Sequence, residues 1–86
     1  MIVHIPSPLR SYTANKSEVE AQGATLGEVL HDLEARYPGI RFRMIDEQGC
    51  VRPHIKIFVN KSLAQNLAVG VTTECEVHII AALSGG

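Results

Sequence analysis

The sequence lacks a long hydrophobic run, because no apolar stretch approaches the roughly 20 residues that a membrane-spanning helix needs. Residues 1–6 lack the basic start and the long apolar segment of a secretory signal, so we expect the protein to be cytoplasmic. The chain has two cysteines, Cys50 and Cys75, which are too few for a ferredoxin-type iron–sulfur cluster. In a cytoplasmic protein we expect both to be free thiols.

An excess of charge of one sign is also missing. Eight Lys and Arg residues stand against nine Asp and Glu residues, so the chain has no general attraction to nucleic acid or anionic membranes. Arginines gather in the middle of the chain, but no aromatic residues that stack on bases accompany them. We interpret this group as a solvated loop face, with docking of an acidic partner as the alternative: Arg36, Arg41, Arg43 and Arg52.

No group of side chains typical of an active site or a metal centre stands out. The four histidines, His4, His31, His54 and His78, lack metal-ligand spacing, and a structural zinc site takes four ligands. We therefore predict no metal and no catalytic residue. A chain of 86 residues also has little room for a deep substrate pocket beside a stable core. We expect a carrier, an adaptor or a small non-catalytic subunit rather than an enzyme.

The sequence does contain the pattern of one small domain over residues 1–82. Short β-rich segments at 1–5 and 17–21 come first, and a helix follows. Thr25 is a good N-cap, and Glu28 stands at the capping-box spacing. The apolar residues of this helix form one stripe, and Pro38-Gly39 then ends it: Leu26, Val29, Leu30, Leu33 and Tyr37. Residues 39–53 read as irregular structure with a turn at 46–49.

Two further strands are predicted at 55–60 and 75–82. Their alternation places one set of residues toward a core: Ile55, Ile57, Val59, Cys75, Val77 and Ile79. Phe58 and Ile80 then lie on the other face. The order strand-strand-helix-strand-strand is that of an α+β, β-grasp (ubiquitin-like) domain. We expect a mixed sheet of four to five strands, with the helix packed on one face and the other face open.

Three segments carry a resemblance to a known family. They are ATLGEVL at 24–30 with Tyr37-Pro38-Gly39, RPHIKIFVN at 52–60, and EVHIIAALSGG at 76–86. In order and spacing they resemble the MoaD/ThiS family of ubiquitin-like sulfur carrier proteins, and the second segment resembles its CysO-like branch, which serves cysteine synthesis. Lys61 follows Asn60 where family members usually have glycine, so we expect a different turn there.

The resemblance implies that the chemistry takes place at Gly85-Gly86. Glycine has no Cβ, so this pair can enter a narrow channel and leaves the Gly86 carboxylate sterically bare. By resemblance, a ubiquitin-activating-type adenylating enzyme activates this carboxylate with ATP, and sulfur then displaces AMP to leave a thiocarboxylate. The chain itself binds no cofactor. We expect residues 83–86 to form a flexible tail, since Ala81 to Gly86 spans about 20 Å when extended.

A tail alone binds weakly, so we expect an exposed apolar patch that docks the partners. The candidates are Phe58, Ile80, Leu83 and Ser84. The expected partners are the adenylating enzyme and a sulfur-accepting synthase for cysteine, molybdopterin, thiamine or thiolated tRNA. Two alternatives stay open. In the first alternative, the chain is a protein modifier that is conjugated through Gly86. In the second, it is a structural β-grasp subunit without tail chemistry.

Overall fold

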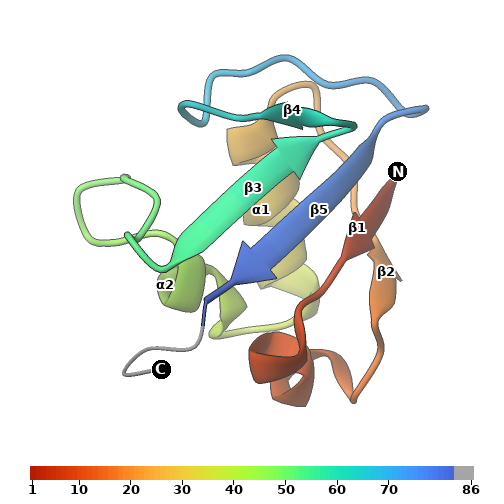
Figure 1. The fold of residues 1–86 in the computed structure, drawn as a ribbon. Coiled ribbons are helices and arrows are strands. Elements are labelled where there is room, and N and C mark those ends of the chain that lie inside the picture. The colour runs from red at the N-terminus through yellow and green to blue at the C-terminus, as the bar shows by residue number, and fades with distance from the viewer. Residues whose placement is uncertain (83–86) are drawn as a thin grey trace.

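Five strands form one mixed sheet in the structure, a computed structural model that describes residues 1–82. In chain order they are β1 (Ile2–His4), β2 (Glu18–Glu20), β3 (Ile55–Val59), β4 (Ser62–Leu63) and β5 (Glu76–Ala81). In space the order is β2-β1-β5-β3-β4. The first and last strands therefore run side by side at the centre, and they are parallel, while the other pairs are antiparallel (Figure 1).

The main helix, α1 (Leu26–Arg36), begins and ends as the sequence predicts. The Thr25 hydroxyl accepts a hydrogen bond from the Glu28 backbone N–H at 3.2 Å, and the Glu28 carboxylate accepts one from the Ala24 N–H at 2.9 Å. Two backbone donors at the start of the helix are thus satisfied. The predicted stripe faces inward, because Leu26, Val29, Leu30 and Leu33 are fully buried.

Alternation along the strands gives the sheet an inner and an outer face. Helix α1 packs on the inner face, behind the sheet in Figure 1. The strands supply the other half of the core from this face: Val3, Val19, Ile55, Ile57, Val77 and Ile79. Each such side chain stabilises the fold by roughly 1.5–3 kcal/mol when it is fully buried. The outer face carries no helix among the described residues, so its side chains meet solvent. The prediction of a β-grasp fold is confirmed.

Two short helical segments and the short strand β4 were not predicted from the sequence. A 3₁₀ segment, η1 (Ser7–Thr13), follows Pro6 and lies between the two predicted β-rich segments, 1–5 and 17–21. Helix α2 (Ile40–Met44) lies within residues 39–53, so the prediction of irregular structure there is wrong for these five residues. Ile40 and Met44 stand four residues apart on one face and are fully buried. One turn of helix is too short to show a stripe in the sequence.

The predicted turns are present around these elements. The Asp46 carboxylate accepts hydrogen bonds from the backbone N–H groups of Gln48, at 2.9 Å, and Cys50, at 3.0 Å. Asn60 closes the turn from β3 to β4 with a positive φ of 57°. Asparagine tolerates this left-handed conformation, so the turn forms without the family's glycine. Among the described residues, no helix is long and apolar enough to cross a membrane.

Gly23 provides a test of the packing between β2 and α1. A Cβ atom added there lies 2.7 Å from the Val29 backbone nitrogen and 2.8 Å from the Glu28 Cβ, so the helix has to shift. We expect Gly23→Ala to lower the free energy of unfolding by about 1–3 kcal/mol. At Gly70 the nearest atom is 4.0 Å away, so Gly70→Ala is the matched control and should change stability by less than about 1 kcal/mol. Equal effects of the two substitutions in urea denaturation contradict this packing.

Glu34 links the two helices through its carboxylate. It accepts hydrogen bonds from the backbone N–H groups of Gly39, at 2.8 Å, and Arg41, at 2.9 Å, and so caps the start of α2. These two bonds, that from Gly39 first, lower the pKa of Glu34 below its usual range. A carboxyl whose pKa is lower in the folded state stabilises the fold above its unfolded pKa, near about 4.3. This stabilisation is lost as the pH falls through the folded-state pKa.

Glu34→Gln should therefore lower the Tm most above about pH 5, where the carboxylate is charged in both states. The difference from the unsubstituted chain should shrink as the pH falls and the carboxyl becomes protonated. Thermal unfolding followed by circular dichroism over this pH range measures it. A Tm difference that stays constant with pH means that the charge of Glu34 does not contribute.

Candidate functional site

The outer face of the sheet carries the two predicted docking residues that the structure describes. Ile80 of β5 points outward and is 51% exposed, and its partner on β3 is Lys56. Phe58, half-buried, lies on the same face, opposite His78 of β5 and opposite Leu63 of β4. Leu63 is 43% exposed. Phe58, Leu63 and Ile80 thus form one cross-strand group, which we call the outer apolar patch.

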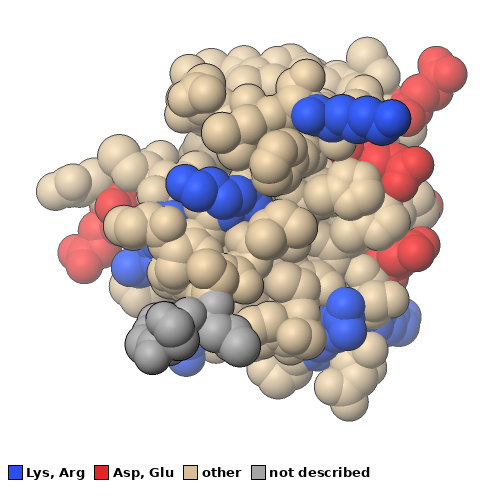
Figure 2. Space-filling view, in the orientation of Figure 1, with Lys and Arg blue, Asp and Glu red and all other residues tan. Residues whose placement is uncertain are grey.

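Apart from Lys56, which lies beside Ile80, charged groups stand around this patch. Figure 2 looks onto the outer face, where uncharged atoms occupy the centre and the Lys and Arg side chains stand apart from one another. Acidic side chains gather at one edge, at the right of the view. The edge strand β2 supplies the exposed Glu18 and Glu20, and the start of the central strand β5 supplies the exposed Glu76. An apolar centre with a charged rim is the usual composition of a protein docking surface.

The end of β5 fixes where the C-terminal segment begins. Ala81 is the partner of Ile55, and the Ala82 N–H donates to the His54 carbonyl oxygen at 2.9 Å. Leu83, Ser84, Gly85 and Gly86, which include the predicted reactive residue, lie outside the described residues. Their predicted roles stay predictions. The described chain thus delivers the segment at one corner of the sheet, beside β3.

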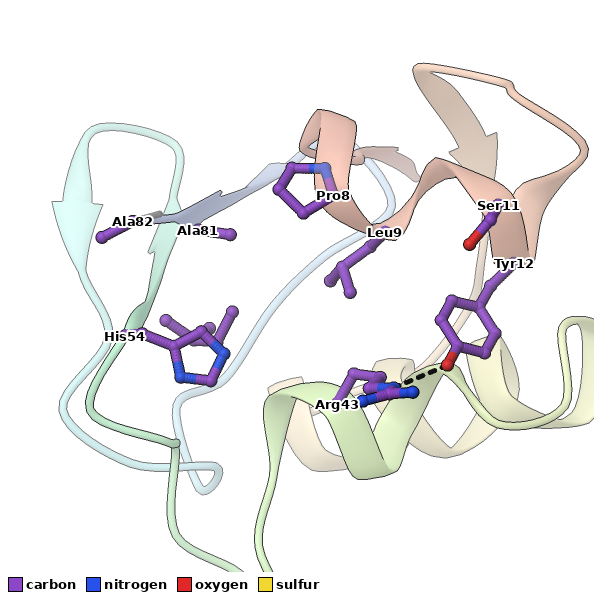
Figure 3. A pocket seen from close by; sticks show the side chains of 9 residues that line it. Pro8, Leu9, Ser11, Tyr12, Arg43, His54, Ala81 and Ala82 are labelled. Atoms are coloured by element: carbon purple, nitrogen blue, oxygen red, sulfur yellow. Dashed lines mark hydrogen bonds between the residues drawn. The ribbon is translucent and has the colours of Figure 1, made fainter. Parts of the chain in front are cut away.

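A hollow of about 400 Å³ opens at this corner (Figure 3). Ala81 and Ala82 line one side of it, and residues from η1 and α2 line the other. Across the hollow, the Arg43 Nε donates a hydrogen bond to the Tyr12 hydroxyl at 2.6 Å. Figure 3 shows His54 and Arg43 at the border of the hollow, so polar groups lie near the place where β5 ends.

The arginine group spans the end of α1, helix α2 and the loop after it, and most of it has partners within the chain. Arg36 pairs with Asp32 at 2.9 Å. Arg52 lies over the ring of Phe42, 4.6 Å from its centroid, and donates to the Phe42 carbonyl oxygen at 2.7 Å. With Phe42 57% exposed, this surface is solvated as the sequence predicts, but Arg36, Arg41 and Arg43 lie on helices rather than in a loop. Docking of an acidic partner there stays a prediction.

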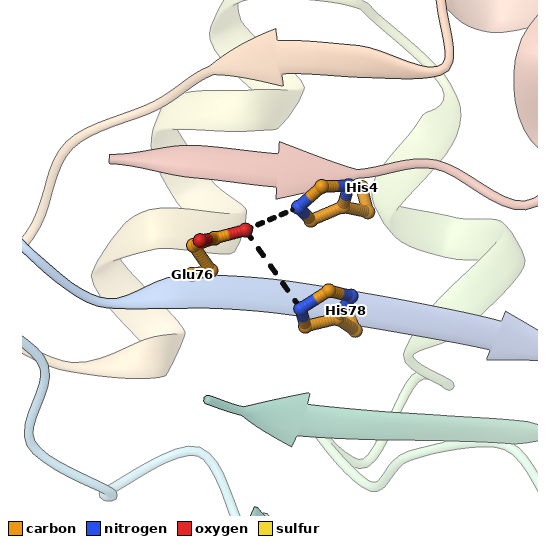
Figure 4. Close-up of side chains that lie close together, drawn as sticks. All are labelled: His4, Glu76 and His78. Atoms are coloured by element: carbon orange, nitrogen blue, oxygen red, sulfur yellow. Dashed lines mark hydrogen bonds and ion pairs between the residues drawn. The ribbon is translucent and has the colours of Figure 1, made fainter. Parts of the chain in front are cut away.

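A further feature, which the sequence did not predict, lies on the outer face between β1 and β5. His4 and His78 are partners in the parallel ladder, and their rings stack with centroids 4.1 Å apart and planes 2° from parallel. The Glu76 Oε1 lies 2.7 Å from the His4 Nε2 and 3.9 Å from the His78 Nε2 (Figure 4). The hydrogen bond with His4 is the main cause that lowers the pKa of Glu76.

The spacing of these residues in the sequence does not predict the cluster, because its members come from opposite ends of the chain. The local signal was incomplete: Glu76 and His78 are two residues apart on one strand face, but nothing near them indicates His4. Only the pairing of the first strand with the last, in this register, brings the second imidazole beside them. The order of elements predicted a β-grasp domain, but that order alone does not specify the register.

The two thiols differ in their surroundings. Cys50 is exposed in the loop after Asp46, whereas Cys75 is half-buried just before β5 and packs against the core, near its predicted inward position. The sulfur of Cys75 lies 3.5 Å from the Thr72 hydroxyl and 3.4 Å from the Thr72 N–H. These contacts, the hydroxyl first, lower the pKa of the Cys75 thiol. Cys75 precedes β5, at the end opposite Ala82, so the strand separates it from the C-terminal corner.

Comparison with known proteins places these features in a family. The model of the ThiS family matches residues 3–86. The sulfur carrier protein CysO of Mycobacterium tuberculosis is 37% identical over 89 residues, which cover 98% of this chain and 96% of that protein.

Two solved structures are also similar. The crystal structure of the Amycolatopsis orientalis BexX/CysO complex contains a chain with a TM-score of 0.90 and 33% identity, covering 99% of this chain and 98% of that one. The crystal structure of Mycobacterium tuberculosis CysO gives a TM-score of 0.89 and 36% identity, covering 95% of this chain and 98% of that one. The predictions of the family, of the β-grasp fold and of a sulfur carrier rather than an enzyme are confirmed. The chain belongs to the ThiS family.

Proposed function

We propose that this chain carries sulfur as a thiocarboxylate on Gly86. The observation that supports this most is the extent of the family match, which runs through the Gly85-Gly86 pair to residue 86. The relative at 37% identity over nearly the whole chain is named a sulfur carrier protein. The sulfur-carrier role extends to this chain what that relative's name states, and its location on Gly86 is our proposal.

The chemistry requires activation because a carboxylate is a poor electrophile. In the proposed sequence, the Gly86 carboxylate attacks the α-phosphate of ATP and releases pyrophosphate, which leaves an acyl adenylate. A hydrosulfide ion then attacks the acyl carbon, AMP leaves with one of the former carboxylate oxygens, and loss of the sulfur-bound proton leaves the thiocarboxylate. Two glycines at the end place no Cβ beside the reacting carbon. A partner enzyme supplies the ATP site and the catalytic groups.

The described structure supports separate roles for the two parts of the chain: the C-terminal segment carries the sulfur, and the folded domain binds the partner. Strand β5 ends at one corner of the sheet, and the outer apolar patch lies on the adjoining face, with Ile80 two residues before Ala82. A partner that binds the patch thus holds the start of the C-terminal segment close to its own surface. At about 3.3–3.6 Å per residue, the segment from Ala82 to Gly86 spans up to about 15 Å.

The comparison with a complex structure supports a proposal about the partners. In the Amycolatopsis orientalis structure, a CysO chain forms a complex with BexX. We propose that this chain likewise docks onto two partners in turn, an adenylating enzyme and a sulfur-accepting enzyme. The similarity to CysO favours cysteine synthesis as the destination of the sulfur over molybdopterin, thiamine or thiolated tRNA.

Intact-mass analysis of the chain isolated from its native host tests the site of sulfur loading. We expect a population heavier by the exchange of one oxygen for one sulfur, and we expect deletion of Gly86 to abolish it. Replacement of both cysteines by serine should leave it unchanged, because the sulfur is bound to the carboxyl carbon. An unmodified chain that keeps full activity without Gly86 indicates a structural subunit, and conjugates at higher mass indicate a protein modifier.

The outer apolar patch predicts a second effect. Ile80→Asp places a desolvated charge at the centre of the docking surface, and Phe58→Ala removes its aromatic anchor. We expect each to weaken binding to the adenylating enzyme at least about tenfold, equivalent to about 1.4 kcal/mol, measured by titration calorimetry. Ile80 is half-exposed and outside the core, so the fold should survive the charge.

Ala35→Asp is the matched control for this substitution. It adds the same charge at an exposed position on α1, the helix that packs against the opposite face of the sheet. This variant should bind the enzyme like the unsubstituted chain. Normal binding by a folded Ile80→Asp variant shows that the docking surface lies elsewhere.

A further inference from the structure

We propose that His4, Glu76 and His78 form a binding site for one divalent transition-metal ion, with Zn²⁺ as the expected occupant. Each residue offers one ligand atom, and the three atoms all lie within 4.8 Å of one another. Imidazole nitrogens and a carboxylate oxygen are ordinary zinc ligands at about 2.0–2.2 Å. Two nitrogen ligands disfavour Ca²⁺ and Mg²⁺, which take oxygen ligands.

The backbone holds these three residues in place from two central strands. His4 and His78 are direct partners in the β1–β5 ladder, and Glu76 is the partner of Ile2 in the same ladder. Because alternate residues of a strand share a face, Glu76 and His78 project to the same side. Both strands are paired on both sides, so the Cα positions of the ligands are fixed by hydrogen bonds rather than by a loop.

The ligand atoms already lie close together, and both rings have to turn to bind one ion. Figure 4 shows both Nε2 atoms turned toward the same carboxylate oxygen of Glu76. A single ion cannot lie in both ring planes while the rings are parallel, since the lone pair of each nitrogen lies in the plane of its ring. Rotation about the Cβ–Cγ bonds of His4 and His78, a broad torsion, turns both lone pairs toward a common centre. Neither backbone nor core has to move.

The carboxylates around the cluster favour a cation, and Arg10, which borders the same hollow, has its Nε bound to the Ile5 carbonyl oxygen. Glu18, on β2, places a carboxylate oxygen 3.9 Å from the Nδ1 of His4, on the side of the ring away from Glu76. A metal-bound histidine commonly donates its other ring N–H to such a carboxylate, which orients the ring and raises its basicity. The two glutamates together balance the charge of a divalent ion. The only basic residue on the outer positions of β3 is Lys56, which pairs with Ile80 and not with the histidines.

Solvent can reach the cluster, and one coordination position stays open. The side chains of His4 and His78 are 29% and 40% exposed. Both line a hollow of about 300 Å³ between η1 and β5, which Ile80 also borders. Three protein ligands in a tetrahedral arrangement leave the fourth position to water or to a group from another molecule.

Titration of the full-length, metal-free chain with Zn²⁺ tests the proposal. We expect one ion to bind per chain at pH 7.5, and we expect His4→Gln and His78→Gln each to weaken binding at least about tenfold, since even partners outside the ligand shell have effects of that size. His31→Gln and His54→Gln are the matched controls, because both residues are exposed and lie outside the cluster. In the same titration, NMR should show the ring signals of His4 and His78 shifting together.

In the competing account, the three side chains only form hydrogen bonds with one another and exchange protons, and no metal ion binds. The titration distinguishes this account from the metal site. Absence of one-to-one binding overturns the metal site, and so does equal binding by the unsubstituted chain and by the His4→Gln/His78→Gln double variant. Thermal unfolding with excess EDTA checks that the variants fold. The substitutions lie on the outer face, so the Tm in EDTA should change little, whereas Zn²⁺ should raise the Tm of the unsubstituted chain alone.

Discussion

The parallel pairing of β1 with β5 determines most of the other features of this structure. The other strands build outward from these two, since β2 pairs with β1, β3 pairs with β5, and β4 pairs with β3. Without this pairing the sheet falls into two narrow pieces, neither wide enough to cover the apolar stripe of α1. Val3 and Val77, direct partners across the junction, are both fully buried under the helix. The centre of the sheet is therefore also the centre of the core.

The same pairing assigns the residues that stabilise the fold and the residues that can bind partners to opposite faces of the sheet. Inward positions of the two strands contact α1, and the outward positions remain on a face that no described helix covers. On that face lie the outer apolar patch and the histidine cluster, and β5 leads the chain to the corner where the C-terminal segment starts. Outward residues can change to suit a partner or an ion without altering the packing of the core. A carrier that meets several partners needs this independence.

Local patterns in the sequence predicted the parts of the fold that repeat often enough to show a period. The apolar stripe and the Thr25–Glu28 cap predicted α1, and alternation predicted β3, β5 and their inward faces. The segments η1, α2 and β4 span too few residues for a period to be visible, and tertiary contacts, such as the Glu34 cap on α2, stabilise them. The histidine cluster depends on a long-range register, which no local pattern contains.

The position of Phe58 and Ile80 on the outer face could be predicted because it follows from alternation alone. Their partner Leu63 could not, since it joins the patch only through β4. The roles of Leu83, Ser84, Gly85 and Gly86 depend on chemistry that a partner supplies, and these residues lie outside the described part of the chain. Similarity to relatives, rather than geometry, supports that part of the account.

Fragmentation of the C-terminal peptide by tandem mass spectrometry tests the central claim most directly. The chain, charged by its native host and isolated without reductant, is digested, and the fragment ions locate the added sulfur. The account predicts that the exchange of oxygen for sulfur appears only in fragments that contain the carboxyl group of Gly86. Sulfur found on Cys50 or Cys75 instead, with an unmodified Gly86, contradicts it.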